Sequence, residues 1–62
     1  MKYTLRQTRL LREISQEKMA NELGIHRNTY ANWEDNPGRI PIEQAKRISE
    51  ILQVKTDDIF FN

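Results

Sequence analysis

The sequence has no cysteine, a single histidine, two glycines and two prolines among its 62 residues. The absence of cysteine excludes disulfides, and one histidine without a dense group of acidic residues provides no structural metal site. Apolar runs are no longer than three residues, which excludes a signal peptide and a membrane-spanning helix. We therefore expect a cytoplasmic protein whose stability comes from helix packing, with or without help from dimerisation.

A chain of this length forms one domain at most, residues 1–62, near the size at which a single core only marginally outweighs chain entropy. The sequence contains no Ser/His/Asp or Cys/His set, its paired carboxylates lack a cleft, and so small a core encloses little pocket. We therefore predict that the protein is not an enzyme and needs no cofactor.

The net charge of +1 is distributed unevenly along the chain. Residues 1–33 carry six Lys or Arg against three Glu, a balance of +3, while residues 34–62 carry four basic against six acidic side chains, a balance of −2. One part of the surface can therefore face phosphate while the other cannot. Chance asymmetry in a small, highly charged domain explains the same numbers equally well.

Apolar periodicity and capping residues predict four or five short helices. The first spans about residues 4–12, with Thr4 as its N-cap. Leu10 and Leu11 broaden its apolar face, so we expect both leucines to help cover the core.

The C-terminal part of the chain is expected to complete the core. A loop over residues 35–41 ends in Pro41, which suits the first turn of the next helix. That helix places apolar residues at spacings of three and four: Ile42, Ala45, Ile48 and Leu52. A last helical turn begins at the capping residue Thr56 and brings Ile59 to the core.

Residues 15–34 have the pattern of a helix-turn-helix, with the first helix capped by Ser15 and ended by Gly24. Only Gly24 and Ile25 separate it from the second helix, which covers about residues 26–34. The expected contacts between the two helices involve Met19, Ala20, Leu23, Ile25, Tyr30 and Trp33. This packing leaves four residues pointing outward: Arg27, Asn28, Ala31 and Asn32.

Together these residues resemble the Cro/phage-repressor (XRE-type) helix-turn-helix family, from about Leu5 to Phe60. The matching elements, at the family's spacings, are Arg9, Ser15-Gln16-Glu17, Ala20, Gly24-Ile25, Trp33-Glu34, Pro41 and Asp58-Ile59-Phe60. The resemblance implies an all-α, compact five-helix lambda-repressor-like fold. It also implies a bacterial or phage-encoded regulator of transcription, in particular a repressor, that binds double-stranded DNA.

The resemblance further implies that the recognition helix, about residues 26–34, lies in the major groove. Carried over to this sequence, the base contacts fall to Arg27, Asn28 and Asn32. Arginine binds guanine O6 and N7 with two hydrogen bonds, and asparagine binds adenine N6 and N7 in the same way. The alternative is that these are polar residues on a solvated helix face.

Contacts to phosphate, which fix the register on DNA, are also implied. Gln16 is expected to reach a phosphate from the N-terminus of its helix, or else only to cap that helix. His26 is expected to be an N-cap or a phosphate neighbour rather than a metal ligand. Lys2 and Arg6 suit a phosphate contact and a plain surface role equally well. The loop is expected to contribute Asn36, Gly38 and Arg39.

By the same resemblance, Arg9 and Glu34 are implied to form a structural ion pair that orients the recognition helix.

Some residues depart from the family pattern. Glu13 stands where the family often has glycine, so the backbone must tolerate a strained or differently shaped turn there. Thr8 replaces an apolar residue, His26 replaces a Ser or Thr cap, and Asp35-Asn36-Pro37 brings an acidic residue and a proline into the phosphate-facing loop. We expect these departures to weaken DNA affinity.

One short helix reads only a few base pairs, so we expect a homodimer on a roughly palindromic operator, with recognition helices ~34 Å apart. Phe60, Phe61 and the last helix are candidates for the dimer interface. The alternative function is a protein-interaction module, such as an antitoxin, that uses the same fold and binds another polypeptide with the Tyr30 and Trp33 side or the Phe60-Phe61 end. The chain is either a complete small Cro-like protein or the N-terminal domain of a longer repressor.

Overall fold

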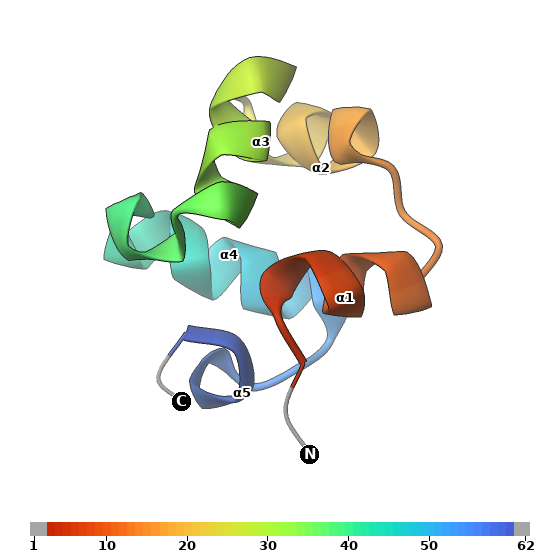
Figure 1. The fold of residues 1–62 in the computed structure, drawn as a ribbon, viewed down its shortest axis with the longest axis vertical. Helices are drawn as coiled ribbons and strands as arrows, with labels where there is room; N and C mark the ends of the chain where they lie inside the picture. The colour runs from red at the N-terminus through yellow and green to blue at the C-terminus, as the bar shows by residue number, and fades with distance from the viewer. Residues whose placement is uncertain (1–2, 61–62) are drawn as a thin grey trace.

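The computed structural model describes residues 3–60, and this part of the chain is helical with short connecting turns (Figure 1). In this range, five α-helices and one short 3₁₀ helix follow one another: α1 (Leu5–Leu11), α2 (Gln16–Leu23), α3 (Arg27–Asp35), η1 (Pro37–Arg39), α4 (Ile42–Leu52) and α5 (Thr56–Phe60). The predicted all-α, five-helix fold is therefore confirmed. None of the helices in the described range is long and apolar enough to cross a membrane.

Side chains that accept free backbone N–H groups fix where α1 and α2 begin. Thr4 Oγ1 accepts from the amide of Gln7 at 3.1 Å, while Gln7 Oε1 accepts from the amide of Thr4 at 2.9 Å, a reciprocal capping box. Ser15 Oγ accepts from the amide of Lys18 at 3.0 Å. The predicted caps Thr4 and Ser15 are confirmed.

Within the described chain, α1, α2 and α4 are each followed, one or two residues beyond their last residue, by a residue in the left-handed conformation. These residues are Glu13 (φ 57°), Gly24 (φ 69°) and Gln53 (φ 59°). In each case the next residue, which is apolar, donates its backbone N–H to the carbonyl five residues earlier, at 3.0–3.3 Å. Those apolar residues, Ile14, Ile25 and Val54, pack against the core. The strained turn predicted at Glu13 is therefore present, and each turn also contributes to packing.

The core takes side chains from all five α-helices. Its buried members are Leu5, Met19, Ala20, Leu23, Tyr30, Ile48, Leu52 and Ile59. The contact between α2 and α3 is the most extensive of any two helices, and α4 contacts both α2 and α5. α2 and α3 therefore lie together at one end of the molecule, and α5 lies at the other (Figure 1).

Three apolar residues expected on the core side are exposed instead. Leu10, Leu11 and Ile42 keep 59, 62 and 60% of their surface exposed. α1 turns Thr8 and Arg9 inward, because Arg9 reaches a buried carboxylate, and this leaves both leucines on the outer face. Ile42 is the first residue of α4, beyond the reach of the core.

The segment predicted as a loop over residues 35–41 is more regular than expected. Asp35 is the last residue of α3, and residues 37–39 form the 3₁₀ turn η1, which begins at Pro37. Pro41 is the N-cap of α4 rather than a residue of its first turn. A proline ring fixes φ near the helical value, which favours a tight turn at Pro37.

Arg12 and Arg47 tie helix ends to neighbouring helices. Arg12 Nε donates to the carbonyl of Leu52 at 2.8 Å, at the end of α4, and Arg47 Nη2 donates to the carbonyl of Glu22 at 2.7 Å, near the end of α2. The last carbonyls of a helix have no partner within it. The two arginines donate hydrogen bonds to carbonyls of this kind and place positive charge at the negative ends of the helix dipoles.

Candidate nucleic-acid interface

α3 is exposed along the side that the sequence assigns to DNA. Arg27, Asn28 and Asn32 are exposed, and at 3.6 residues per turn they fall within an arc of roughly 140° around the helix axis. Two other residues of α3, Tyr30 and Glu34, are buried and fix the helix in the protein. The structure therefore brings the three predicted base-reading residues onto one free face.

The turn before α3 sets this helix against α2. Gly24 adopts the left-handed conformation that the sequence predicts. His26 is the N-cap of α3, since its Nδ1 accepts the backbone N–H of Asn28 at 3.0 Å, so the expectation that it caps the helix is confirmed. In the neutral ring this bond leaves the proton on Nε2, on an exposed side chain at the N-terminal end of α3.

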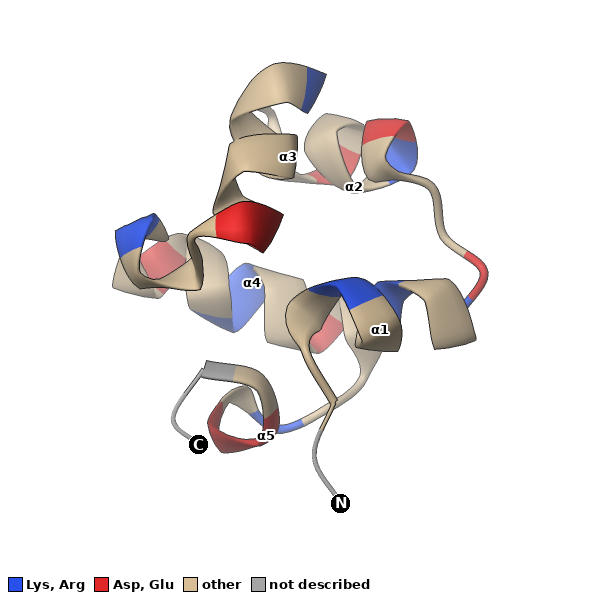
Figure 2. Cartoon of the chain, in the orientation of Figure 1, with Lys and Arg blue, Asp and Glu red and all other residues tan. Residues whose placement is uncertain are grey.

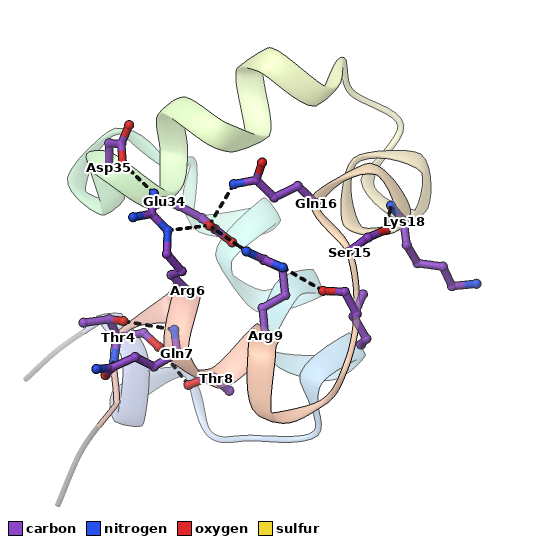
Figure 3. A network of polar contacts seen from close by, with 11 residues as sticks. Thr4, Arg6, Gln7, Thr8, Arg9, Ser15, Gln16, Lys18, Glu34 and Asp35 are labelled. Atoms are coloured by element: carbon purple, nitrogen blue, oxygen red, sulfur yellow. Dashed lines mark hydrogen bonds and ion pairs between the residues drawn. The ribbon is translucent and has the colours of Figure 1, made fainter.

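Glu34, in the last turn of α3, joins three helices (Figure 3). Arg9 of α1 binds it through two nitrogens, Nε to Oε2 at 2.6 Å and Nη2 to Oε1 at 3.3 Å. Arg6 Nε donates to Oε1 at 3.1 Å, and Gln16 Nε2, from the first residue of α2, donates to the same oxygen at 3.0 Å. The Glu34 side chain is fully buried. The expected Arg9–Glu34 pair is present as part of this larger network.

Burial and hydrogen bonding act in opposite directions on the pKa of Glu34. Burial alone would raise this pKa, because it removes water from the charged form, but donors led by Arg9 stabilise the carboxylate and lower its pKa to about 2. The Tyr30 hydroxyl lies buried near this carboxylate without a hydrogen bond of ordinary geometry. Burial and, after it, the neighbouring Glu34 raise the pKa of Tyr30. At neutral pH, Glu34 is therefore charged and Tyr30 is neutral.

Gln16 has a partner that the sequence did not predict. Its amide donates to Glu34, and its side chain is half-buried. An amide nitrogen carries two N–H groups, so one remains for a phosphate, and that contact stays a prediction. Gln16 borders a polar hollow at the start of α2 and α3, lined by Arg9, Ser15, Gln16, Glu17 and Arg27. Among the described residues Arg27 has no ion-pair partner, so its guanidinium is free at this hollow.

The loop after α3 presents the other residues expected at phosphate. Asn36, Gly38 and Arg39 are exposed. Two backbone hydrogen bonds order the turn. The N–H of Asn36 donates to the carbonyl of Asn32 at 2.9 Å, and the N–H of Arg39 donates to the carbonyl of Asn36 at 3.0 Å. Arg39 has no ion-pair partner within the described part of the chain. The loop thus holds one free cation in a defined turn, and its contact with phosphate stays a prediction.

Arg6 has a role that sequence reasoning missed. Besides Glu34 it binds Asp35, with Nη2 2.7 Å from Oδ1, so it bridges two consecutive acidic residues. Figure 2 shows the positively charged residues of α1 facing the acidic C-terminal end of α3. The spacing of these residues in the sequence could have indicated this contact. Arg6 precedes Arg9 by about one helical turn, so both lie on the same side of α1, and Asp35 directly follows Glu34. Lys2, Phe61 and the side chain of Phe60, also considered for contacts, lie outside the described residues.

Comparison with known families agrees with this geometry. A helix-turn-helix family model, that of the Cro/C1-type proteins, matches residues 5–59. No curated protein and no solved structure matches the chain. Proteins of this family are DNA-binding regulators, and the match covers every helix that forms the exposed face of α3 and its support. The chain therefore belongs to the Cro/C1-type (XRE) family of DNA-binding helix-turn-helix regulators.

Proposed function

We propose that this protein is a sequence-specific transcriptional repressor that reads the major groove of a DNA operator with α3. The observation that carries the proposal is the exposure of Arg27, Asn28 and Asn32 along one face of a helix that Tyr30 and Glu34 anchor in the protein. A recognition helix needs both features, because its side chains must reach base edges from a rigid support.

The free polar groups on α3 suit direct reading of bases. Arg27 has no ion-pair partner among the described residues, so both terminal nitrogens of its guanidinium are available to guanine O6 and N7. Asn28 and Asn32 suit adenine N6 and N7. Each good two-bond contact contributes ~1 to 3 kcal/mol of discrimination between bases.

Phosphate contacts are proposed on either side of the recognition helix. Two observations support them: the exposed Nε2–H of His26 at the start of α3, and the ordered turn that presents Arg39 after its end. Such contacts fix the register of the protein on the duplex and carry no sequence information themselves. The proposed set is Gln16, His26, Asn36, Gly38 and Arg39.

The proposal includes a homodimer on a palindromic operator. A single α3 covers only a few base pairs, so two copies are needed for useful specificity. The longest Cα extent of the domain is 29 Å, comparable to the ~34 Å between successive major-groove faces of DNA. Two adjacent copies can therefore insert their α3 helices one DNA turn apart.

Selection of bound duplexes from a random library tests the proposal, using wild type, Arg27→Ala and Asn32→Ala. Lys46→Ala is the matched control, because Lys46 is an exposed cation on α4 and its loss changes the charge as much as loss of Arg27. We expect related half-sites for wild type and the control, and relaxed preference at particular bases for the α3 variants. Absence of a consensus, or a consensus that both α3 variants retain, would contradict direct reading by α3.

A second candidate function is a protein-interaction module, such as an antitoxin. The observation that favours it is an exposed apolar surface formed by Leu10 and Leu11 on the outer face of α1 together with Tyr3, which precedes this helix. Adjacent exposed apolar side chains are typical of surfaces that bind another polypeptide. Duplex selection separates the two functions, because a pure interaction module yields no consensus with any of the four proteins.

A further inference from the structure

An acidic residue lies within the face of α3 that is proposed to bind DNA. At roughly 100° per residue, Asp35 falls between Arg27 and Asn32 around the helix axis, close to Asn28 in angle. Its side chain is 60% exposed. It also ends the helix, where the backbone carbonyls already carry a partial negative charge. A free carboxylate at this point repels the phosphate backbone of an approaching duplex.

Arg6 holds this carboxylate against α1. Its Nη2 lies 2.7 Å from Asp35 Oδ1 and its Nε lies 3.1 Å from Glu34 Oε1, so one guanidinium spans both acidic residues (Figure 3). The bond to the fully buried Glu34 fixes the inner end of this bridge. Together with Arg9, the junction of α1 and α3 contains two positive and two negative side chains, and their charges cancel.

We propose that Arg6 is a positioning residue for DNA binding. It neutralises Asp35 and keeps the carboxylate directed toward α1, which makes the C-terminal turn of α3 acceptable to phosphate. In this role Arg6 acts through Asp35 and needs no contact of its own with DNA. The inference rests on the proposed function of α3, and it explains how an acidic residue is tolerated on a DNA-reading face.

A double-mutant cycle on the selected operator tests this role. Arg6→Gln frees the Asp35 carboxylate while Glu34 keeps its bonds to Arg9 and Gln16, and it is expected to weaken binding roughly fivefold. Asp35→Asn alone is expected to leave binding unchanged or to tighten it. In the double variant, binding returns to the level of Asp35→Asn, so the coupling between the two substitutions is about 1 kcal/mol.

Arg12→Gln is the matched control for the cycle. Arg12 is also exposed at the end of α1, but it binds the carbonyl of Leu52 rather than an acidic side chain. Its loss lowers the net charge equally, and we expect its effect to be additive with that of Asp35→Asn. Urea unfolding of every variant gives the folded fraction. A merely structural Arg6 would lose binding in step with that fraction, and Asp35→Asn would not restore it.

Two outcomes overturn the inference and leave the proposed function standing. In the first, Arg6→Gln binds as tightly as wild type. In the second, the double variant stays as weak as Arg6→Gln and shows a shallower salt dependence, which assigns Arg6 to a phosphate contact. If the wild-type protein selects no duplex, this result contradicts both the proposed function of α3 and the positioning role of Arg6.

Arg6→Lys keeps the test decisive if Arg6→Gln fails to fold. Lysine retains the charge but has one nitrogen on its side chain, so it cannot bridge both carboxylates as a guanidinium does. We expect a partial loss of operator binding that Asp35→Asn restores. A partial loss that Asp35→Asn leaves unchanged overturns the inference.

Discussion

The buried carboxylate of Glu34 should make the stability of this domain depend on acidic pH. Its pKa is about 2 in the folded protein, against an ordinary value of 4.5. Because the folded pKa is the lower one, the unfolded chain takes up the proton first, and stability present above pH 4.5 is lost as the pH falls toward 2. At about 1.4 kcal/mol per unit of pKa, the loss is roughly 3 kcal/mol. The whole free energy of unfolding of a domain of this length is only about 3 to 9 kcal/mol.

Urea unfolding across this pH range, followed by circular dichroism, measures the loss. Glu34→Gln has no carboxylate to protonate in this pH range, so its stability should change less with pH than that of wild type. Its free energy of unfolding at neutral pH should be about 3 to 5 kcal/mol lower than that of wild type, because Arg9 loses its buried partner. Glu22→Gln is the control: Glu22 is exposed, its bridge to Lys18 is 3.7 Å long, and the variant should follow wild type.

An NMR titration of the Glu34 carboxyl in wild type gives the pKa directly, even if Glu34→Gln is too unstable for unfolding measurements. The expected midpoint is the value of about 2 that the hydrogen-bond network produces. A midpoint near the ordinary 4.5 would refute the reasoning. So would a Glu34→Gln protein that loses stability as steeply as wild type between those two pH values.

Three further predictions concern helix ends, and urea midpoints measure each of them. Glu13→Gly and Gln53→Gly remove left-handed strain at φ 57° and 59°. Each should raise the free energy of unfolding by roughly 0.5 kcal/mol, after allowance for the greater freedom of glycine in the unfolded chain, and a decrease would contradict the strain argument. Gly24→Ala meets no atom within 4 Å but must adopt φ 69°, so we expect a loss of roughly 1 kcal/mol, and an unchanged midpoint would show that the turn relaxes. Ser15→Ala removes the N-cap of α2 and should cost about 1 kcal/mol; no loss would mean that water replaces the cap.

Sequence predicted those features whose partners are close along the chain. Thr4 and Ser15 accept from amides three residues later, and Gly24 ends α2 through bonds within the same turn. Both partners of such a bond are visible in a short window of sequence, so the starts of α1 and α2 and the turn of the helix-turn-helix were predicted correctly. The outward position of Arg27 and Asn32 follows from helix periodicity in the same way.

Features that depend on distant partners could not be predicted in this way. Hydrophobicity favours burial of Leu10 and Leu11, but α1 is rotated by the bond from Arg9 to Glu34, 25 positions away. The pair itself was expected only through the family resemblance. Gln53 gave no turn signal, because glutamine has no preference for positive φ, and its conformation accompanies the packing of Val54 against the core. The contacts of α3 with DNA stay a prediction.

The arginines that bind helix carbonyls affect how the domain opens. Arg12 and Arg47 reach carbonyls 40 and 25 positions away in the chain. Helix ends usually fray by themselves, with little free energy required. Here the ends of α2 and α4 lose a hydrogen bond whenever the neighbouring helix moves away, so their opening is coupled to separation of the helices. Backbone amides in these last turns should therefore exchange with solvent more slowly than amides at a helix end without such a bond.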